Sequence, residues 1–258
     1  MIVDNQKLFH LLNCNKNNYD FTAHSSRKVI GQRKRYFKYL EKDFDQIHPT
    51  VPTLEDWYNK DTVYPNLHPA HQKVVDTVTD LNPVSICEVG AGAGVVSKYV
   101  FNAHPEVELT CIEPNKQNFK LIHKNFKKNS KIIKPFLDVK ANIINASGQK
   151  IPLENNSIEF VFTCTVLMHV PFLMIPDTVS EISRVSSKYI FHVENPNDKI
   201  NAVHIPNKKL KFDRVLNKLE INYETIYESL GFSVIEKDTW KDPVADCDYV
   251  SYLYKKIL

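Results

Sequence analysis

One run of residues has the types and spacing needed to bind a ligand through its backbone. Residues 86–100 read ICEVGAGAGVVSKYV, so a short apolar stretch leads into glycines at positions 90, 92 and 94. The chain has only six glycines, and half of them lie in these five positions. Backbone without a Cβ can turn sharply and lie close to a ligand, and the following helix would offer it free N–H groups. The run therefore predicts a ligand-binding loop rather than a simple turn.

Two acidic residues near this loop narrow the choice of ligand. Glu88 precedes Gly90 by two residues, where a carboxylate would repel a pyrophosphate but would suit a ligand carrying an ammonium and a sulfonium group. Val95 also occupies the position of the third glycine in the dinucleotide-binding fingerprint. Glu113, in CIEPN, ends the next apolar run and is placed to accept both ribose hydroxyls of an adenosine. Its alternative role is that of an acid stabilised by a helix dipole.

The elements that must position these residues alternate between strand and helix after position 84. Hydrophobic periodicity predicts strands over 84–89, 107–112, 142–146, 158–164, 188–193, 232–235 and 249–254. It predicts helices over 69–81, 97–103, 115–128, 178–186 and 209–230. This alternation indicates an α/β fold with a mostly parallel sheet covered by helices on both faces. Residues 1–80 are polar and lack a strong strand, so we expect a separate N-terminal segment before a main domain over 81–258.

From about Val84 to Leu258 the sequence resembles the class I S-adenosylmethionine-dependent methyltransferases. Besides the loop and Glu113, residues 148–170, GQKIPLENNSIEFVFTCTVLMHV, are similar to the family's A-x-x-L-P-F-x-x-x-S-F-D-x-V segment with its L-H-H-V turn. Residues 181–191, EISRVSSKYIF, are similar to its E-x-x-R-V-L-K-P-G-G-x-L, with Ser-Ser-Lys replacing the Pro-Gly-Gly turn. The likeness is closest to the small-molecule branch that includes the ubiquinone and menaquinone methylases.

The resemblance implies a Rossmann-like, seven-stranded sheet with an antiparallel last strand, a helical lid over residues 1–80, and S-adenosylmethionine as cofactor. It places the following residues around that cofactor: Glu88, Gly90, Ala91, Gly92, Gly94, Glu113, Pro114, Asn115, Asn145, Ala146, Ser147, Thr163, Cys164 and Thr165. Glu113 would hold the ribose hydroxyls, and residues 163–165 would face the methyl group. The family's adenine-contacting acid has no acidic counterpart, because Asn145 and Ser147 occupy the nearest positions.

Three residues are candidates for catalysis because sheets of this kind bind ligands at the carboxyl ends of their strands. His169 follows the fourth predicted strand, and His192 and Glu194 end the fifth. A hydroxyl acceptor needs a base to remove its proton, which any of these side chains could supply. Each of the three could instead be structural, with His192 packed within its strand and His169 within a loop.

Composition and motifs argue against several other classes. A net charge of +3, from 33 basic and 30 acidic residues, does not by itself favour nucleic acid. Five cysteines without a CxxC pair argue against a disulfide framework or a zinc site, and we expect no metal. No signal peptide is recognisable, and no apolar run reaches the ~20 residues of a membrane span, so we expect a cytoplasmic protein. The missing D/N-P-P-Y/F/W and Pro-Cys motifs disfavour methylation of base amino groups and of cytosine C5.

These features together predict a methyltransferase that acts on a small or carrier-linked acceptor, with oxygen as the favoured atom. One alternative is an RNA or protein methyltransferase that docks through a basic stretch over residues 27–38, in which aromatic residues are interleaved. Nucleic acid as a partner therefore stays open but is not favoured. The other alternative is a non-catalytic scaffold on the same fold.

Overall fold

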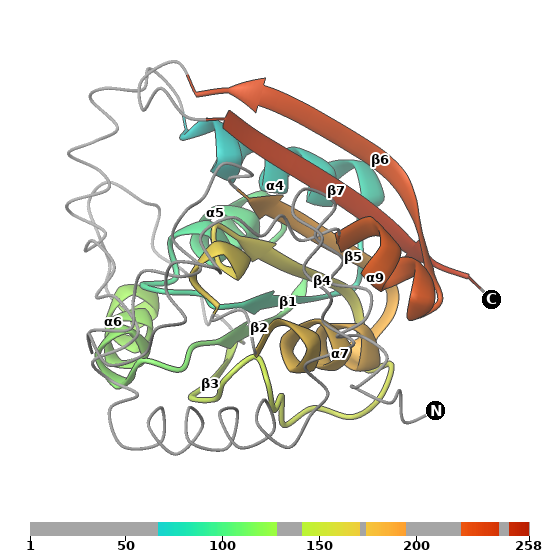
Figure 1. Cartoon of the computed structure of the whole chain (residues 1–258). Helices are drawn as coiled ribbons and strands as arrows, with labels where there is room; N and C mark the ends of the chain where they lie inside the picture. Colours follow the sequence, from blue (N-terminus) through green and yellow to red (C-terminus); the bar gives the residue numbers. More distant parts are fainter. Residues whose placement is uncertain (1–66, 128–140, 171–173, 195–222, 243–247, 258) are drawn as a thin grey trace, which may run out of the picture.

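The computed structural model describes residues 67–127, 141–170, 174–194, 223–242 and 248–257, and their centre is one seven-stranded sheet (Figure 1). The strands lie in the order β3-β2-β1-β4-β5-β7-β6. Five are parallel: β1 (Ser85–Val89), β2 (Glu108–Ile112), β3 (Ala141–Ile144), β4 (Ile158–Cys164) and β5 (Ser186–Glu194). β7 (Asp248–Lys256) runs antiparallel to both β5 and β6 (Phe232–Lys241). The prediction of a Rossmann-like, seven-stranded, mostly parallel sheet is confirmed.

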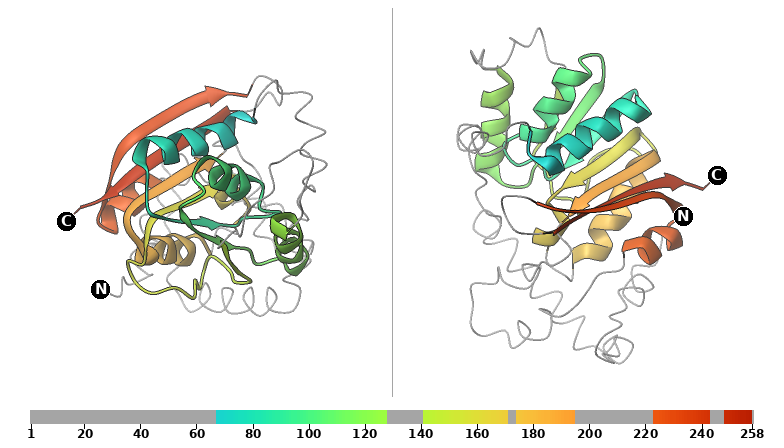
Figure 2. Two further views of the ribbon diagram at one scale, coloured as in Figure 1. Left: turned by 180° about the vertical axis from the view of Figure 1, so that it is seen from behind. Right: turned by 90° about the horizontal axis from the view of Figure 1, so that it is seen from above.

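Helices cover both faces of the sheet, as Figure 2 shows. On one face lie α4 (Pro69–Leu81), α5 (Val95–Ala103) and α6 (Lys116–Lys127), which share one apolar core cluster with the sheet. On the other face lie α7 (Ile175–Val185) and α9 (Tyr223–Ser229), which form a second cluster. All five residues of β1 are buried, as a central parallel strand between two helical layers requires.

The strand order reverses between β1 and β4, and this reversal determines where a ligand can bind. β2 and β3 extend the sheet to one side of β1, while β4 and β5 extend it to the other. The connections that leave β1 and β4 therefore diverge at the carboxyl edge. Open α/β sheets bind ligands in the crevice at such a switch point. The glycine run follows β1, and Thr165 follows β4.

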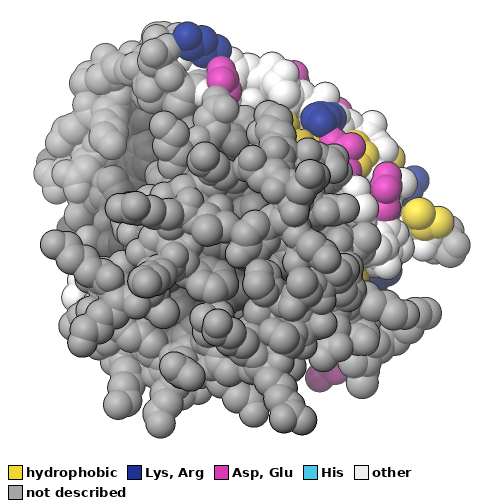
Figure 3. All heavy atoms as spheres, viewed as in Figure 1, with side chains coloured by type: hydrophobic (Ala, Val, Ile, Leu, Met, Phe, Trp, Pro, Cys, Tyr) yellow, Lys and Arg dark blue, Asp and Glu magenta, His cyan; other side chains and the backbone are white. Residues whose placement is uncertain are grey.

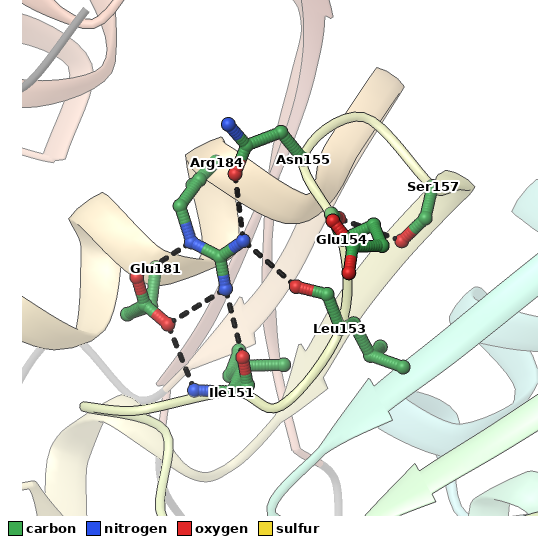
Figure 4. Close-up of polar contacts among 7 residues, drawn as sticks. All are labelled: Ile151, Leu153, Glu154, Asn155, Ser157, Glu181 and Arg184. Atoms are coloured by element: carbon green, nitrogen blue, oxygen red, sulfur yellow. Dashed lines mark hydrogen bonds and ion pairs between the residues drawn. The ribbon is translucent and has the colours of Figure 1, made fainter.

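The connection from β3 to β4 is held against α7 by one guanidinium group (Figure 4). Arg184 donates to the carbonyl oxygens of Ile151 and Leu153 at 2.7 and 2.8 Å, and it pairs with Glu181 at 2.7 Å. Glu181 in turn accepts from the Ile151 N–H at 2.8 Å. Arg184 also donates to Asn155 at 2.8 Å. Glu181 and Arg184, the two ends of the E-x-x-R motif, therefore hold the connection between β3 and β4 in place.

Several element boundaries differ from the sequence-based prediction. β6 was expected to end at residue 235 but continues to Lys241. It is an edge strand whose outer residues are exposed, so charged side chains do not interrupt it. Figure 3 shows acidic and basic side chains interspersed over this strand, and Lys237 pairs with Glu224 at 2.6 Å. β5 begins at Ser186 directly after α7, with no turn in between.

Some predictions lie outside the described residues. These are the N-terminal segment up to residue 66 with its basic stretch, and residues 209–222 of the expected helix over 209–230. Within the described ranges, no helix is long and apolar enough to cross a membrane.

Candidate functional site

The glycine run forms a tight loop that only glycine can build at two of its positions. Gly90, Gly92 and Gly94 all have positive φ, at +81°, +56° and +77°. A Cβ on Gly90 would lie 2.6 and 2.7 Å from the two methyl carbons of Val166. A Cβ on Gly94 would lie 2.9 Å from Phe126 of α6. The N–H groups of Gly90 and Ala91 donate to the Ile112 carbonyl at 2.8 and 3.0 Å, which holds the loop against the end of β2.

Glu88 lies against the first turn of α5 and is 2% exposed. One carboxylate oxygen accepts from the Ser97 backbone N–H at 3.0 Å and also from the Ser97 hydroxyl. Burial raises the pKa of Glu88 to about 8, and the hydrogen bonds from Ser97 oppose this shift. The negative charge of nearby Glu113 acts in the same direction as burial. Glu88 is therefore a buried acid that burial keeps mostly protonated at neutral pH.

Glu113 joins the glycine loop to the start of α6. Its Oε2 accepts from the Gly92 N–H at 2.7 Å, and its Oε1 accepts from the Asn115 N–H at 2.8 Å. Asn115 then begins α6, because its Oδ1 accepts from the N–H groups of Gln117 and Asn118 at 2.8 and 3.1 Å. Glu113 is 4% exposed, and burial raises its pKa.

Asn118 is a polar residue of this site that the sequence reasoning missed. It is 2% exposed, and its Nδ2 lies 3.4 Å from Oε1 of Glu113. Its Oδ1 is buried and has no hydrogen-bond partner among the described residues. The available signal was its position, since Asn118 precedes Ile122 and Phe126 by four and eight residues on the apolar face of the helix.

Residues 145–147, predicted to contact the cofactor, follow β3 at the same edge. Asn145 donates from Nδ2 to the carbonyl oxygens of Glu113 and Pro114, at 2.8 and 3.0 Å. Ala146 packs against the core on the α7 side, and the Ser147 carbonyl accepts from the Lys150 N–H at 3.1 Å. The structure thus brings Asn145 beside Glu113 and Pro114.

A chain of hydrogen bonds connects the ends of β4 and β5. Thr163 donates to Oε1 of Glu194 at 2.9 Å, so its hydroxyl proton is used there. The contact of 2.7 Å between Thr163 Oγ1 and Nδ1 of His192 must then be donated by the histidine. Nε2 of His192 is left to accept from the Tyr227 hydroxyl at 2.7 Å. Burial lowers the pKa of His192 to about 3, so the ring is neutral and both of its nitrogens are used.

Glu194 holds the turn that follows β4. It accepts from the N–H groups of Val166, Leu167 and Met168 at 3.2, 3.0 and 3.2 Å. These residues lead into the short 3-10 helix η2 (Leu167–His169). His169 thus ends a turn next to the glycine loop, although its side chain lies outside the described atoms.

The remaining predicted residues, Cys164 and Thr165, lie between these groups. Cys164 is 7% exposed, and burial raises the pKa of its thiol well above the ordinary value, as do the charges of Glu88 and Glu194. Thr165 has a φ of +56°, which is unusual for a β-branched residue and is typical of strained positions at functional sites. The described residues include no cluster of histidine, cysteine and acidic groups that could hold a metal ion.

Comparison with known proteins identifies the domain. Residues 87–189 match the family model for a methyltransferase domain. No curated protein matches the chain. Among solved structures, a Burkholderia thailandensis 1,6-didemethyltoxoflavin-N1-methyltransferase with bound 1,6-didemethyltoxoflavin and S-adenosylhomocysteine is 10% identical, with a TM-score of 0.56. The alignment covers 88% of this chain and 91% of that one.

Two further structures show how widely the fold is used. Magnesium protoporphyrin IX methyltransferase from Synechocystis PCC 6803, with bound S-adenosylmethionine, is 12% identical over 87% of this chain and 96% of that one, with a TM-score of 0.53. The [4+2]-cyclase SpnF is 12% identical over 81% of this chain and 98% of that one, also with a TM-score of 0.53. At this identity the structures establish the fold. The methyltransferase domain match over residues 87–189 supports the prediction of an S-adenosylmethionine-dependent methyltransferase.

Proposed function

We propose that this protein transfers a methyl group from S-adenosylmethionine to an oxygen atom of a small or carrier-linked acceptor. The observation that carries the proposal is the contact between the glycine loop and the acid after β2, in which the Gly92 N–H donates to Glu113 at 2.7 Å. This contact brings the backbone of Gly92, which has no side chain, beside the buried carboxylate of Glu113 at the switch point of the sheet.

The donor and acceptor groups around Glu113 fit an adenosine. A carboxylate offers about four lone-pair sites, and among the described residues Glu113 accepts from Gly92, Asn115 and Asn118. One site on its Oε2 remains for a ribose hydroxyl. Oδ1 of Asn118 is a second buried acceptor that lacks a donor among the described residues. A ribose carries two hydroxyl donors, and we propose that one of them donates to Oε2 of Glu113.

Positioning does most of the work in this reaction, because the bound cofactor supplies a sulfonium methyl group that is already activated for in-line displacement. We assign residues 163–165 to the wall that faces the methyl group. The thiol of Cys164 stays protonated there, since burial raises its pKa, and it does not compete with the acceptor as a nucleophile.

For the base that accepts the hydroxyl proton we propose His169. The other two candidates are engaged, because His192 uses both ring nitrogens and Glu194 accepts four hydrogen bonds. We assign His192 and Glu194 to holding the end of β4. Since α4 packs into the core of the sheet, we keep the role of a lid that shapes the acceptor pocket for the part of the predicted segment 1–80 that precedes it. The named molecules of two similar structures, a toxoflavin precursor and a porphyrin, are small heterocycles, which supports the small-molecule branch.

The test is calorimetric titration with S-adenosylmethionine and S-adenosylhomocysteine, followed by transfer of a labelled methyl group to cell extracts. Glu113→Ala removes a charged acceptor and should weaken binding about 10- to 100-fold. Gly92→Val should abolish binding by filling the loop. Glu108→Ala is the matched control, because Glu108 is the exposed acid at the other end of β2. The absence of binding by the wild type, or binding by both variants at the wild-type affinity, would overturn the proposal.

The same assays separate the alternatives. Binding without turnover on any extract would indicate a scaffold. RNA binding that is sensitive to salt and is lost when Arg33, Lys34 and Arg35 are neutralised would indicate a macromolecular acceptor.

A further inference from the structure

The carboxylate of Glu194 is surrounded by donors that come from one short segment. Three successive backbone N–H groups, of Val166, Leu167 and Met168, reach it within 3.2 Å, and the Thr163 hydroxyl adds a fourth donor at 2.9 Å. Glu194 is 4% exposed, so solvent cannot replace it as acceptor for these groups. One side chain of β5 therefore accepts from three successive N–H groups of the turn after β4.

That turn lies against the glycine loop. The methyl carbons of Val166 occupy the space directly beside Gly90, where even a Cβ would come within 2.7 Å. The same turn ends at His169, the proposed base. A displacement of the turn would consequently move both the support of the glycine loop and the backbone of the proposed base.

We propose that Glu194 is a positioning residue whose ionised carboxylate holds the turn over residues 166–169 in the conformation that methyl transfer requires. Its effect on turnover depends on the proposed function, whereas its effect on the turn does not. No direct contact between Glu194 and the acceptor is needed.

The hydrogen-bond pattern requires a carboxylate rather than an amide. All four groups that reach Glu194 are donors, and Met168 donates to Oε2 while the others donate to Oε1. A glutamine would turn its own NH₂ group toward one of these N–H groups and leave it without an acceptor. The direction of the Thr163 hydroxyl is also fixed, because His192 donates to Thr163 from the other side.

Two buried acids that act on Cys164 are expected to change ionisation near neutral pH, Glu194 and Glu88 of β1, whose pKa burial raises to about 8. The pH response described below is therefore assigned to Glu194 only where Glu194→Gln abolishes it. Burial raises the pKa of Glu194 to about 7, although its four hydrogen bonds oppose the shift. His192 of β5 stays neutral because burial lowers its pKa to about 3. Burial raises the pKa values of Cys164 on β4 and of Tyr223 and Tyr227 on α9 well above the ordinary ones. Tyr252 on β7 packs near the same tyrosines, and His169 is tested by its own variant below.

The decisive experiment measures amide hydrogen exchange at residues 166–168 in the full-length protein, corrected for the intrinsic pH dependence of exchange. Glu194→Gln should exchange about 10- to 100-fold faster there at pH 8, as expected for loss of hydrogen bonds to a charged acceptor. Glu181→Gln is the matched control, because Glu181 accepts the Ile151 N–H in the same way on another loop. It should accelerate exchange at Ile151 and leave 166–168 unchanged. Unchanged protection of 166–168 in Glu194→Gln would overturn the proposal.

The wild-type protein gives a second test that does not depend on a variant folding. Protection of 166–168 should fall as the pH is lowered from 8 to 6, because a protonated Glu194 loses acceptor sites. Protection of Ile151 should stay constant, since hydrogen bonds from Arg184 and Ile151 outweigh burial and lower the pKa of Glu181. His169→Ala should keep the pH response of 166–168, and its loss in that variant would overturn the assignment to Glu194.

Turnover supplies the functional readout. Where the wild type methylates an acceptor, Glu194→Gln should reduce kcat by about tenfold or more, and an unchanged kcat would refute the role in methyl transfer. If the wild type binds neither S-adenosylmethionine nor S-adenosylhomocysteine, the proposed function fails, and the exchange experiment still decides whether Glu194 holds the turn.

Discussion

The contact between Gly90 and Val166 can be tested with a pair of glycine substitutions. Gly90 and Gly231 have nearly the same backbone conformation, with φ of +81° and +84°. Their surroundings differ, because a Cβ on Gly90 meets the methyl groups of Val166 at 2.6 and 2.7 Å, whereas a Cβ on Gly231 meets no described atom within 4 Å. Comparing Gly90→Ala with Gly231→Ala therefore separates the cost of the contact from the cost of the conformation.

The expected change in the free energy of unfolding has three contributions, of which only the overpacking cost differs between the two variants. An alanine in the left-handed region costs roughly 1–2 kcal/mol, and this cost applies to both variants. The loss of unfolded-chain entropy returns about 0.4–1 kcal/mol, again in both. Overpacking adds roughly 1–3 kcal/mol in Gly90→Ala alone. Gly90→Ala should therefore be less stable than Gly231→Ala by about 1–3 kcal/mol, and its Tm should be lower by roughly 2–4 °C for each kcal/mol.

Urea denaturation of the two single variants and of a double variant checks the reasoning. Val166→Ala removes both methyl carbons that conflict with the new Cβ, so in that background Gly90→Ala should cost only what Gly231→Ala costs. The reasoning is refuted if Gly90→Ala is as stable as Gly231→Ala, or if Val166→Ala leaves the cost of Gly90→Ala unchanged.

Three further predictions concern buried polar groups. Arg184→Ala should lower the free energy of unfolding by about 2 kcal/mol in urea denaturation, since it removes the donor to two carbonyl oxygens and the cation beside Glu181. Arg184→Lys should recover only part of this loss, because an ammonium cannot reproduce the fork of the guanidinium. Asn118→Leu should raise the free energy of unfolding of the apo-protein by about 1 kcal/mol, because it removes an unpartnered buried acceptor. The same variant should bind S-adenosylmethionine about tenfold more weakly in calorimetry. An unchanged affinity would exclude Asn118 from the site. For Glu88, the raised pKa of about 8 means that the folded state keeps a proton that the unfolded chain loses near pH 4.5. Stability should thus fall as pH rises from about 4.5 to 8, and Glu88→Gln, measured across that window, should flatten this dependence.

The sequence was sufficient to predict the elements whose burial is uniform. Residues 158–164 form an apolar run, and β4 begins and ends at the predicted positions. The outer half of β6 could not be predicted, because residues 236–241 alternate charges that the exposed edge of a sheet tolerates. Their strand conformation comes from pairing with β7, a contact that local periodicity does not encode.

The candidate site was predictable in its positions but not in its hydrogen bonds. Gly92 and Glu113 are 21 residues apart, and only the parallel pairing of β1 with β2 brings them within 2.7 Å. Glu194 and His192 stand at a strand end, as expected, yet the sequence cannot show that every lone pair and proton they offer is already used. That information depends on the turn after β4 and on Tyr227, which is 35 residues from His192.

Three buried carboxylates at the carboxyl edge explain why a cationic ligand suits this site. Glu88, Glu113 and Glu194 accept hydrogen bonds from backbone N–H, hydroxyl and amide groups, and burial raises the pKa of each. Because neutral donors do not compensate a negative charge in a poorly solvated place, burial favours the protonated form of these acids. A ligand that brings positive charge would favour their ionised form, whereas a pyrophosphate would oppose it. The ammonium and sulfonium groups of S-adenosylmethionine would meet this requirement, in keeping with the proposed roles of the acids and of the glycine loop.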